Sequence, residues 1–211
     1  MESGKEKNLK AMVVYYSATG NTGKVANAIH EALLAKDVES TLLKVQDAAA
    51  EELYDYDLVF LGSPSIEFLP PAPMMRYIKN KLNLHRARGD IKLCAPRVPN
   101  KTAVVFCTYS GPHTGLDEAT TADKYMAQLR EHIGFYVAGE WYVVGECHNG
   151  RDLNTLGRLG DIRGRPNEQD LAKVRDDTSM LVRSMGKRLS QFPADAHVTM
   201  TDREVVAGGG Q

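Results

Sequence analysis

Three hydroxyl side chains lie close together in residues 17–22, Ser-Ala-Thr-Gly-Asn-Thr. The hydroxyls of Ser17, Thr19 and Thr22 can donate hydrogen bonds to phosphate oxygens. Gly20 between them lets the backbone pass close to a ligand, because it has no Cβ. Residues of these types at this spacing predict a loop that binds a phosphate group.

The segments on either side of these hydroxyls predict how the loop is positioned. The apolar run 12–16 before it predicts a buried strand. Apolar residues four apart follow the loop and predict a helix: Val25, Ile29 and Leu33. Unpaired backbone N–H groups and the helix dipole favour an anion at the start of such a helix. The phosphate would therefore sit between a strand end and a helix N-terminus.

Two other nucleotide-binding patterns fit this segment less well. A P-loop requires glycine where Ala18 stands and a hydroxyl where Val25 stands, so its Mg²⁺ ligand is missing. The dinucleotide fingerprint Gly-x-Gly-x-x-Gly is nearly matched by Ala18, Gly20 and Gly23, but that fingerprint does not call for three hydroxyls. The hydroxyl-rich loop instead favours a terminal phosphate monoester, which offers three oxygens.

Short apolar runs alternate with helical patterns along the rest of the chain. The sequence predicts strands over residues 12–16, 40–45, 57–62, 103–107 and 135–145, the last either bulged or broken at Ala138-Gly139. It predicts helices over about 21–36, 74–82 and 115–133 and from Asn167, which is expected to cap the last one. Residues 84–100 and 147–166 are predicted to be irregular. Such alternation indicates an α/β fold with a doubly wound parallel sheet and right-handed crossovers.

The hydroxyl-rich loop after the first strand resembles the FMN-phosphate loop of the flavodoxin family. The resemblance covers about residues 9–190 and implies a five-stranded sheet of order 2-1-3-4-5 that binds FMN non-covalently. It implies a cofactor site at the loops after strands 1, 3 and 4, which hold the candidate residues Ser17, Ala18, Thr19, Gly20, Asn21, Thr22, Ser63, Pro64, Ser65, Ile66, Glu67, Phe68, Thr108, Tyr109, Ser110, Gly111, His113 and Gly115.

The flavin ring needs apolar faces and polar partners along its edge. Tyr109 is the candidate for stacking on the isoalloxazine, with Ile66 or Phe68 opposite. Backbone groups of 65–67 and 109–111 would reach its N5, N3 and carbonyl oxygens. No side chain is an evident catalytic acid, base or nucleophile, so the chemistry would belong to the cofactor.

Composition bounds the remaining possibilities. The chain has 211 residues and a net charge of −1, which predicts one α/β domain over 9–192 with arms at 1–8 and 193–211. The near-neutral charge offers no argument for nucleic acid or a membrane surface. Three widely spaced cysteines argue against a disulfide framework, and no metal site is expected. Without a signal peptide or an apolar run of 18 residues, a cytoplasmic location is expected.

The function predicted from these observations is an FMN-binding electron-transfer protein or oxidoreductase. A one-electron carrier would meet a redox partner protein, and a two-electron reductase would use NAD(P)H and a small acceptor such as a quinone. The sequence leaves this choice and a homo-oligomeric state open. The alternative from another class is a flavin-free binding or regulatory module with the same fold.

Overall fold

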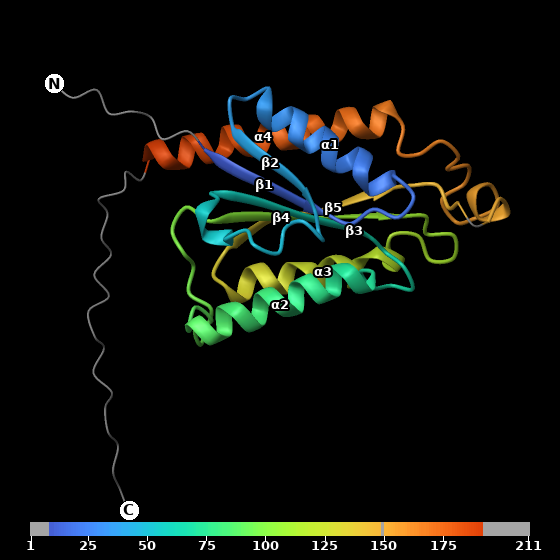
Figure 1. Cartoon of the computed structure of the whole chain (residues 1–211). Coiled ribbons are helices and arrows are strands. Elements are labelled where there is room, and N and C mark those ends of the chain that lie inside the picture. The colour runs from blue at the N-terminus through green and yellow to red at the C-terminus, as the bar shows by residue number, and fades with distance from the viewer. Residues whose placement is uncertain (1–8, 149, 192–211) are drawn as a thin grey trace, which may run out of the picture.

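The computed structural model describes residues 9–148 and 150–191, with side chains described as far as Met185. Helices and strands alternate along this part of the chain (Figure 1). The strands are β1 (Lys10–Tyr15), β2 (Glu39–Lys44), β3 (Leu58–Pro64), β4 (Thr102–Tyr109) and β5 (Tyr136–Val144). The helices are α1 (Asn21–Leu34), α2 (Ala72–Arg88), α3 (Asp117–His132) and α4 (Glu168–Gln191). The predicted arms at 1–8 and 193–211 lie outside the described residues.

The strands form one five-stranded sheet in the order β2-β1-β3-β4-β5, and every neighbouring pair is parallel. This confirms the predicted α/β fold and its strand order. The central strands β3 and β4 are buried along almost their whole length, because helices cover both faces of the sheet. Their continuous apolar sequences follow from that double burial.

The helices make two layers around the sheet. Helices α1 and α4 cover one face, and α2 and α3 cover the other (Figure 1). Each layer encloses its own apolar cluster, one including Val25 and Ile29 from α1 and the other including Met74 and Ile78 from α2. The side chains of β1, β3 and β4 alternate between the two clusters, as expected for strands.

One predicted boundary needs correction, and one alternative that the sequence left open is decided. Helix α2 continues to Arg88, whereas residues 84–88 were predicted to be irregular. The last part of this helix is polar, so its sequence lacks the apolar repeat from which a helix is predicted, although basic residues are favourable at a helix C-terminus. The last strand is continuous and bulged rather than broken, because the partners of Ala103 and Val104 are Val137 and Gly139, which leaves Ala138 between them.

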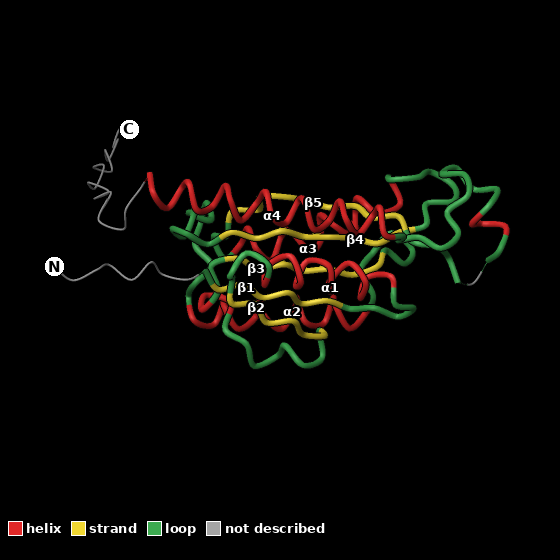
Figure 2. The backbone as a smooth tube through the Cα atoms, turned by 90° about the horizontal axis from the view of Figure 1, so that it is seen from above, coloured by secondary structure: helices red, strands yellow, loops and turns green. Residues whose placement is uncertain are grey.

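The loops after the strands share one end of the molecule. Figure 1 shows the start of α1, the loop before α3 and the long loop after β5 at the same end, and Figure 2 shows the same grouping from above. Because all strands are parallel, their carboxyl ends meet there, where ligands of such sheets bind. The segment between α2 and β4 lies at the opposite end. Within the described residues, no helix has the length and apolarity needed to span a bilayer.

Candidate functional site

The loop after β1 is shaped by its first hydroxyl. The Oγ of Ser17 accepts hydrogen bonds from the N–H of Gly20 (3.1 Å) and of Gly23 (3.2 Å). Gly20 has φ 100°, a left-handed conformation that glycine adopts without strain. Ala18, Thr19 and Gly20 are exposed, so this turn presents its backbone and the Thr19 side chain to solvent.

The N-terminus of α1 differs from those of α3 and α4 in its polar groups. Its N-cap residue is Gly20, which has no side chain, and Ser17 binds only the N–H of Gly23 in the first turn. The first turn contains no acidic residue. Helix α3 carries Asp117 and Glu118 in its first turn, and α4 carries Glu168 and Asp170. The positive dipole end of α1 is therefore not offset by an acidic side chain. The N–H groups of Asn21 and Thr22 precede the first intrahelical bond, from Lys24 to Gly20, and are the ones that face an anion at this end. This arrangement fits a phosphate group.

Two predicted site residues join this loop to other strands. Thr22 is buried, and its Oγ1 lies 2.7 Å from Oγ1 of Thr108 at the end of β4. The Nδ2 of Asn21 donates to the carbonyl of Glu146 after β5 (3.0 Å). The loop is thus anchored to the two strands beyond β3, and the exposed donors for a ligand are Thr19 and the backbone.

The loop after β3 is anchored to β4 and α3 through Ser65. Its N–H donates to the carbonyl of Thr108 (2.9 Å), and its Oγ donates to the carbonyl of Glu118 (2.5 Å). Ser63 is fully buried, and its hydroxyl donates to the carbonyl of Pro64, so its side chain belongs to the interior. The loop therefore starts from a fixed base.

Beyond Ser65 the loop folds into a tight turn. Ile66 and Leu69 pair as an antiparallel bridge, and the two residues between them have positive φ, 49° for Glu67 and 69° for Phe68. Non-glycine residues rarely adopt this conformation. The turn keeps Ile66 and Phe68 about half exposed, at 49% and 57%. These apolar side chains can therefore contact a flat ring or the surface of a partner protein.

The loop after β4 is compact. Gly111 has φ 51°, and a Cβ there would come within 2.6 Å of the carbonyl oxygen of Gly115, so the close approach requires glycine. Glu118 in the first turn of α3 accepts hydrogen bonds from the N–H groups of His113 and Thr114 (both 2.7 Å), which holds this loop against the start of the helix. Tyr109 and Ser110 are half-buried, and His113 is exposed.

A fourth segment, residues 145–166, joins this group of loops. Gly145 donates its N–H to the carbonyl of Tyr109 (2.8 Å), and Arg158 donates its N–H to the carbonyl of Pro112 (2.8 Å). The segment is held internally by Asn154, whose amide bonds both the N–H and the carbonyl of Cys147 (2.7 and 2.8 Å). Sequence reasoning did not assign this segment to the site; its Gly- and Arg-rich composition was the signal.

The segment also brings a cation near Tyr109. The guanidinium of Arg165 forms a two-pronged contact with the carboxylate of Asp170, with Nε to Oδ2 at 2.9 Å. Burial raises the pKa of Tyr109, and the charge of Arg165 partly opposes that rise. Asn167 caps α4 as predicted, accepting from the N–H of Asp170 (3.1 Å). The Arg165–Asp170 pair thus joins the end of this segment to the start of α4.

The structure therefore brings all three predicted loops to one end of the sheet and adds a fourth. Backbone bonds connect the loops after β3, β4 and β5, and side chains connect the loop after β1 to them. Among the described residues, no three His, Cys, Asp or Glu side chains gather as metal ligands would. The arrangement can hold an anion at one side and a flat, mostly apolar group beside it.

Comparisons with known proteins agree with this geometry. The family model for flavodoxin matches residues 13–106. A flavodoxin from the domain Archaea is similar over 84% of this chain and 99% of its own, with a TM-score of 0.59 and 19% identity. Flavodoxin 1 from Bacillus cereus is similar over 82% of this chain and 97% of its own, with a TM-score of 0.58 and 16% identity.

Larger proteins contain the same fold. The flavodiiron protein from Giardia intestinalis has a TM-score of 0.58 and 16% identity, and the match covers 86% of this chain but 37% of that protein. At these identities the structural matches show the fold. The sequence match over residues 13–106, which includes the loop after β1, supports the predicted family.

Proposed function

We propose that this flavodoxin-like chain binds FMN non-covalently at the carboxyl end of its sheet and passes electrons through it. The observation that carries the proposal is the start of α1, which has no acidic residue in its first turn and follows a hydroxyl-bearing loop. A phosphate there would meet the helix dipole and the backbone N–H groups. The match to the flavodoxin family over the same loop supports FMN as the phosphate ester.

The bound flavin would supply the electron-carrying chemistry, and the chain binds and orients it. Thr19 and the first N–H groups of α1 hold the phosphate. Tyr109 offers an aromatic face to the ring, with Ile66 or Phe68 on the other side. Backbone groups of 65–67 and 109–111 meet the polar edge of the ring.

The exposed apolar side chains beside this site favour an electron carrier that meets a redox partner protein. Ile66 and Phe68 are each about half exposed on the turn after β3. Apolar and aromatic side chains of this kind form the centres of protein interfaces. A reductase that uses NAD(P)H is the second candidate. It is favoured by the long segment after β5, which is hydrogen-bonded to the loop after β4 at Tyr109 and Pro112 and so adds residues beside the site.

Titration of the FMN-free protein with FMN and with riboflavin tests the proposed site. Riboflavin lacks the phosphate, so the difference between the two affinities reports the phosphate contacts. We expect FMN to bind more tightly, and Thr19→Val to weaken FMN binding by about 1–3 kcal/mol while leaving riboflavin unchanged. Thr121→Val, an exposed threonine on α3, is the matched control. Equal affinities for the two flavins, or no binding of either, would contradict the proposal.

Stopped-flow mixing of the FMN-loaded protein with NADH and NADPH separates the two candidates. A carrier leaves the oxidised flavin absorbance unchanged over seconds and is reduced by a partner protein. Rapid bleaching by either nucleotide would remove the carrier and support the reductase.

A further inference from the structure

A stripe of polar residues runs along the buried side of α2. Tyr77, Lys81 and His85 follow one another at intervals of four, so they share one face of the helix. They are only 5%, 4% and 0% exposed. This face packs in the layer that α2 and α3 make under the sheet. Polar groups at such positions require partners in the interior.

Arg130 of α3 faces this stripe and is completely buried. Within the described part of the chain, none of its three guanidinium nitrogens finds a hydrogen-bond partner. The hydroxyl of Tyr77 lies beside the guanidinium and interacts with it weakly, but no regular hydrogen bond forms between them there. Nε2 of His85 has no hydrogen-bond partner there either. An arginine stays protonated in a protein, so Arg130 cannot avoid the cost of burying a charge by losing its proton. A buried cation without a partner is strongly unfavourable.

The carboxylates nearest the stripe are already engaged. Glu51 accepts a hydrogen bond from the hydroxyl of Tyr56 (2.5 Å), and Glu52 is paired with Arg88. Asp90 binds Nδ1 of His85 at 2.8 Å.

The second buried cation adds to the positive charge. The Nζ of Lys81 donates to the carbonyl of Ala49 (2.9 Å) and to that of Glu51, so it has partners but no carboxylate of its own. Burial lowers the pKa of Lys81, and the charge of Arg130 lowers it further. Two cations therefore lie near each other in the interior, and five nitrogen and oxygen atoms of the stripe and Arg130 remain without partners.

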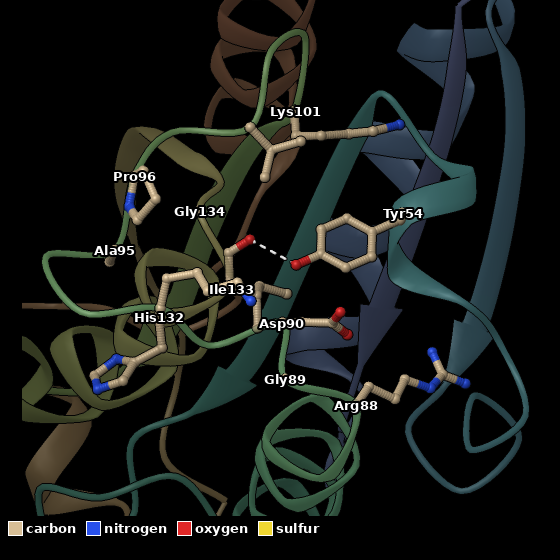
Figure 3. A pocket seen from close by; sticks show the side chains of 12 residues that line it. Tyr54, Arg88, Gly89, Asp90, Ala95, Pro96, Lys101, His132, Ile133 and Gly134 are labelled. Carbon is tan, nitrogen blue, oxygen red and sulfur yellow. Dashed lines mark hydrogen bonds between the residues drawn. The ribbon is translucent and has the colours of Figure 1, made fainter. Parts of the chain in front are cut away.

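A pocket of about 480 Å³ opens next to this stripe, at the end of the sheet opposite the proposed FMN site. Figure 3 shows Tyr54 in the middle of it, with its hydroxyl donating to the carbonyl of Ile133 (2.9 Å). The ring of Tyr54 meets that of His85 edge to face at 5.3 Å, and Asp90 lines the pocket while bonding His85. The pocket thus borders the buried stripe at His85, and its lining includes the basic residues Arg88, Lys92, Lys101 and His132.

We propose that Arg130 and Tyr77 bind a small monovalent inorganic anion, such as chloride, between α2 and α3, and that the pocket around Tyr54 is its route from solvent. The three guanidinium nitrogens of Arg130 and the hydroxyl of Tyr77 are all hydrogen-bond donors, and a halide accepts such bonds without offering a donor in return. The enclosure of Arg130 favours a single small ion over phosphate or a carboxylic acid. The anion supplies the missing counter-charge for Arg130 and Lys81.

Two measurements on the FMN-loaded protein test this site; loading keeps the phosphate loop occupied. The first follows thermal unfolding in sodium chloride, bromide or gluconate at constant ionic strength, together with the width of the ³⁵Cl NMR signal. We expect halides to raise the unfolding temperature relative to gluconate, and the protein to broaden the ³⁵Cl signal. In Arg130→Met both effects should disappear, and in Tyr77→Phe the chloride affinity should fall about tenfold or more, as for a lost hydrogen bond to a charged group. Arg76→Met, an exposed arginine on α2, is the control and should behave as the unsubstituted protein does.

The second measurement locates the ion. Crystals grown in bromide should show an anomalous peak between Tyr77 and Arg130. An ordered water at that position, or unfolding that does not distinguish halide from gluconate, would overturn the proposal. If Arg130→Met fails to fold, Tyr77→Phe and the bromide crystal still decide it. The test does not depend on the flavin, since the peak lies at a different end of the sheet from the phosphate loop.

Discussion

Asp123 offers a direct test of how burial controls ionisation in this fold. The residue lies on α3 and is completely buried. Tyr142 interacts weakly with its carboxylate, but neither carboxylate oxygen forms a regular hydrogen bond within the described residues. Around it lie Tyr142 and Glu140 of β5, Cys107 of β4 and the neighbouring Lys124, which is paired with Glu140 at 2.6 Å. Burial raises the pKa of Asp123 to about 8, and the negative charge of Glu140 adds to the rise.

The direction of the effect on stability follows from proton binding. Between pH 4 and pH 8 the folded protein holds a proton on Asp123 that the unfolded chain has released. The contribution of Asp123 to the free energy of unfolding is therefore fully present below about pH 4 and is lost as the pH rises towards 8. One proton corresponds to about 1.4 kcal/mol per pH unit, so the loss over this range is on the order of 5 kcal/mol.

The perturbation is Asp123→Asn, which keeps the shape of the protonated side chain and cannot ionise. The assay is urea unfolding followed by circular dichroism from pH 4.5 to 8.5. The variant should match the unsubstituted protein near pH 4.5 and become progressively more stable than it towards pH 8, because every other titrating group is common to both. Parallel pH curves would refute the reasoning, since they would mean that Asp123 binds the same number of protons in both states.

Two further predictions concern packing and loop structure. Gly62→Ala should lower the free energy of unfolding by about 1–3 kcal/mol, because its Cβ would lie 2.1 Å from the buried ring of Phe106. Gly23→Ala in α1 should instead raise the free energy of unfolding by about 0.5–1 kcal/mol, because the nearest atom to its Cβ is 3.6 Å away and alanine is favoured over glycine in a helix. Urea unfolding measures both free energies. Equal changes in the two variants would mean that the space beside Gly62 is not more restricted than that beside Gly23. Asn154→Ala should speed hydrogen exchange in residues 147–166 because it removes both bonds to Cys147, each worth about 1 kcal/mol; unchanged exchange would show that other contacts hold the segment.

The strands and most helices were predictable from the sequence because their patterns are regular. The buried strands β3 and β4 are continuous apolar runs, and α1 repeats Val25, Ile29 and Leu33 on its inner face. The loop at 17–22 was recognisable because its residue types are unusual and local. The strand order came from the family resemblance, since a sequence period carries no information on which strands are neighbours.

The contacts between distant segments could not be predicted in the same way. The hydroxyl pair Thr22–Thr108 joins residues 86 positions apart, and nothing in either local sequence identifies the other. Asp123 and Arg130 were also missed, because charged residues are almost always exposed unless paired. Their places beside the apolar residues of α3 became evident only when the helix was seen against the sheet and α2.

The bonds from Asn21 and Thr22 to distant backbone and side-chain atoms have a consequence for protein engineering. Residues 17–22 are not a self-sufficient module that can be transplanted into another strand–helix junction. A graft would have to carry a hydroxyl at the position of Thr108 on β4 and a carbonyl at that of Glu146 after β5, two and three strands away from β1. A recipient scaffold should therefore be chosen for its neighbouring strands as much as for the junction that receives the loop.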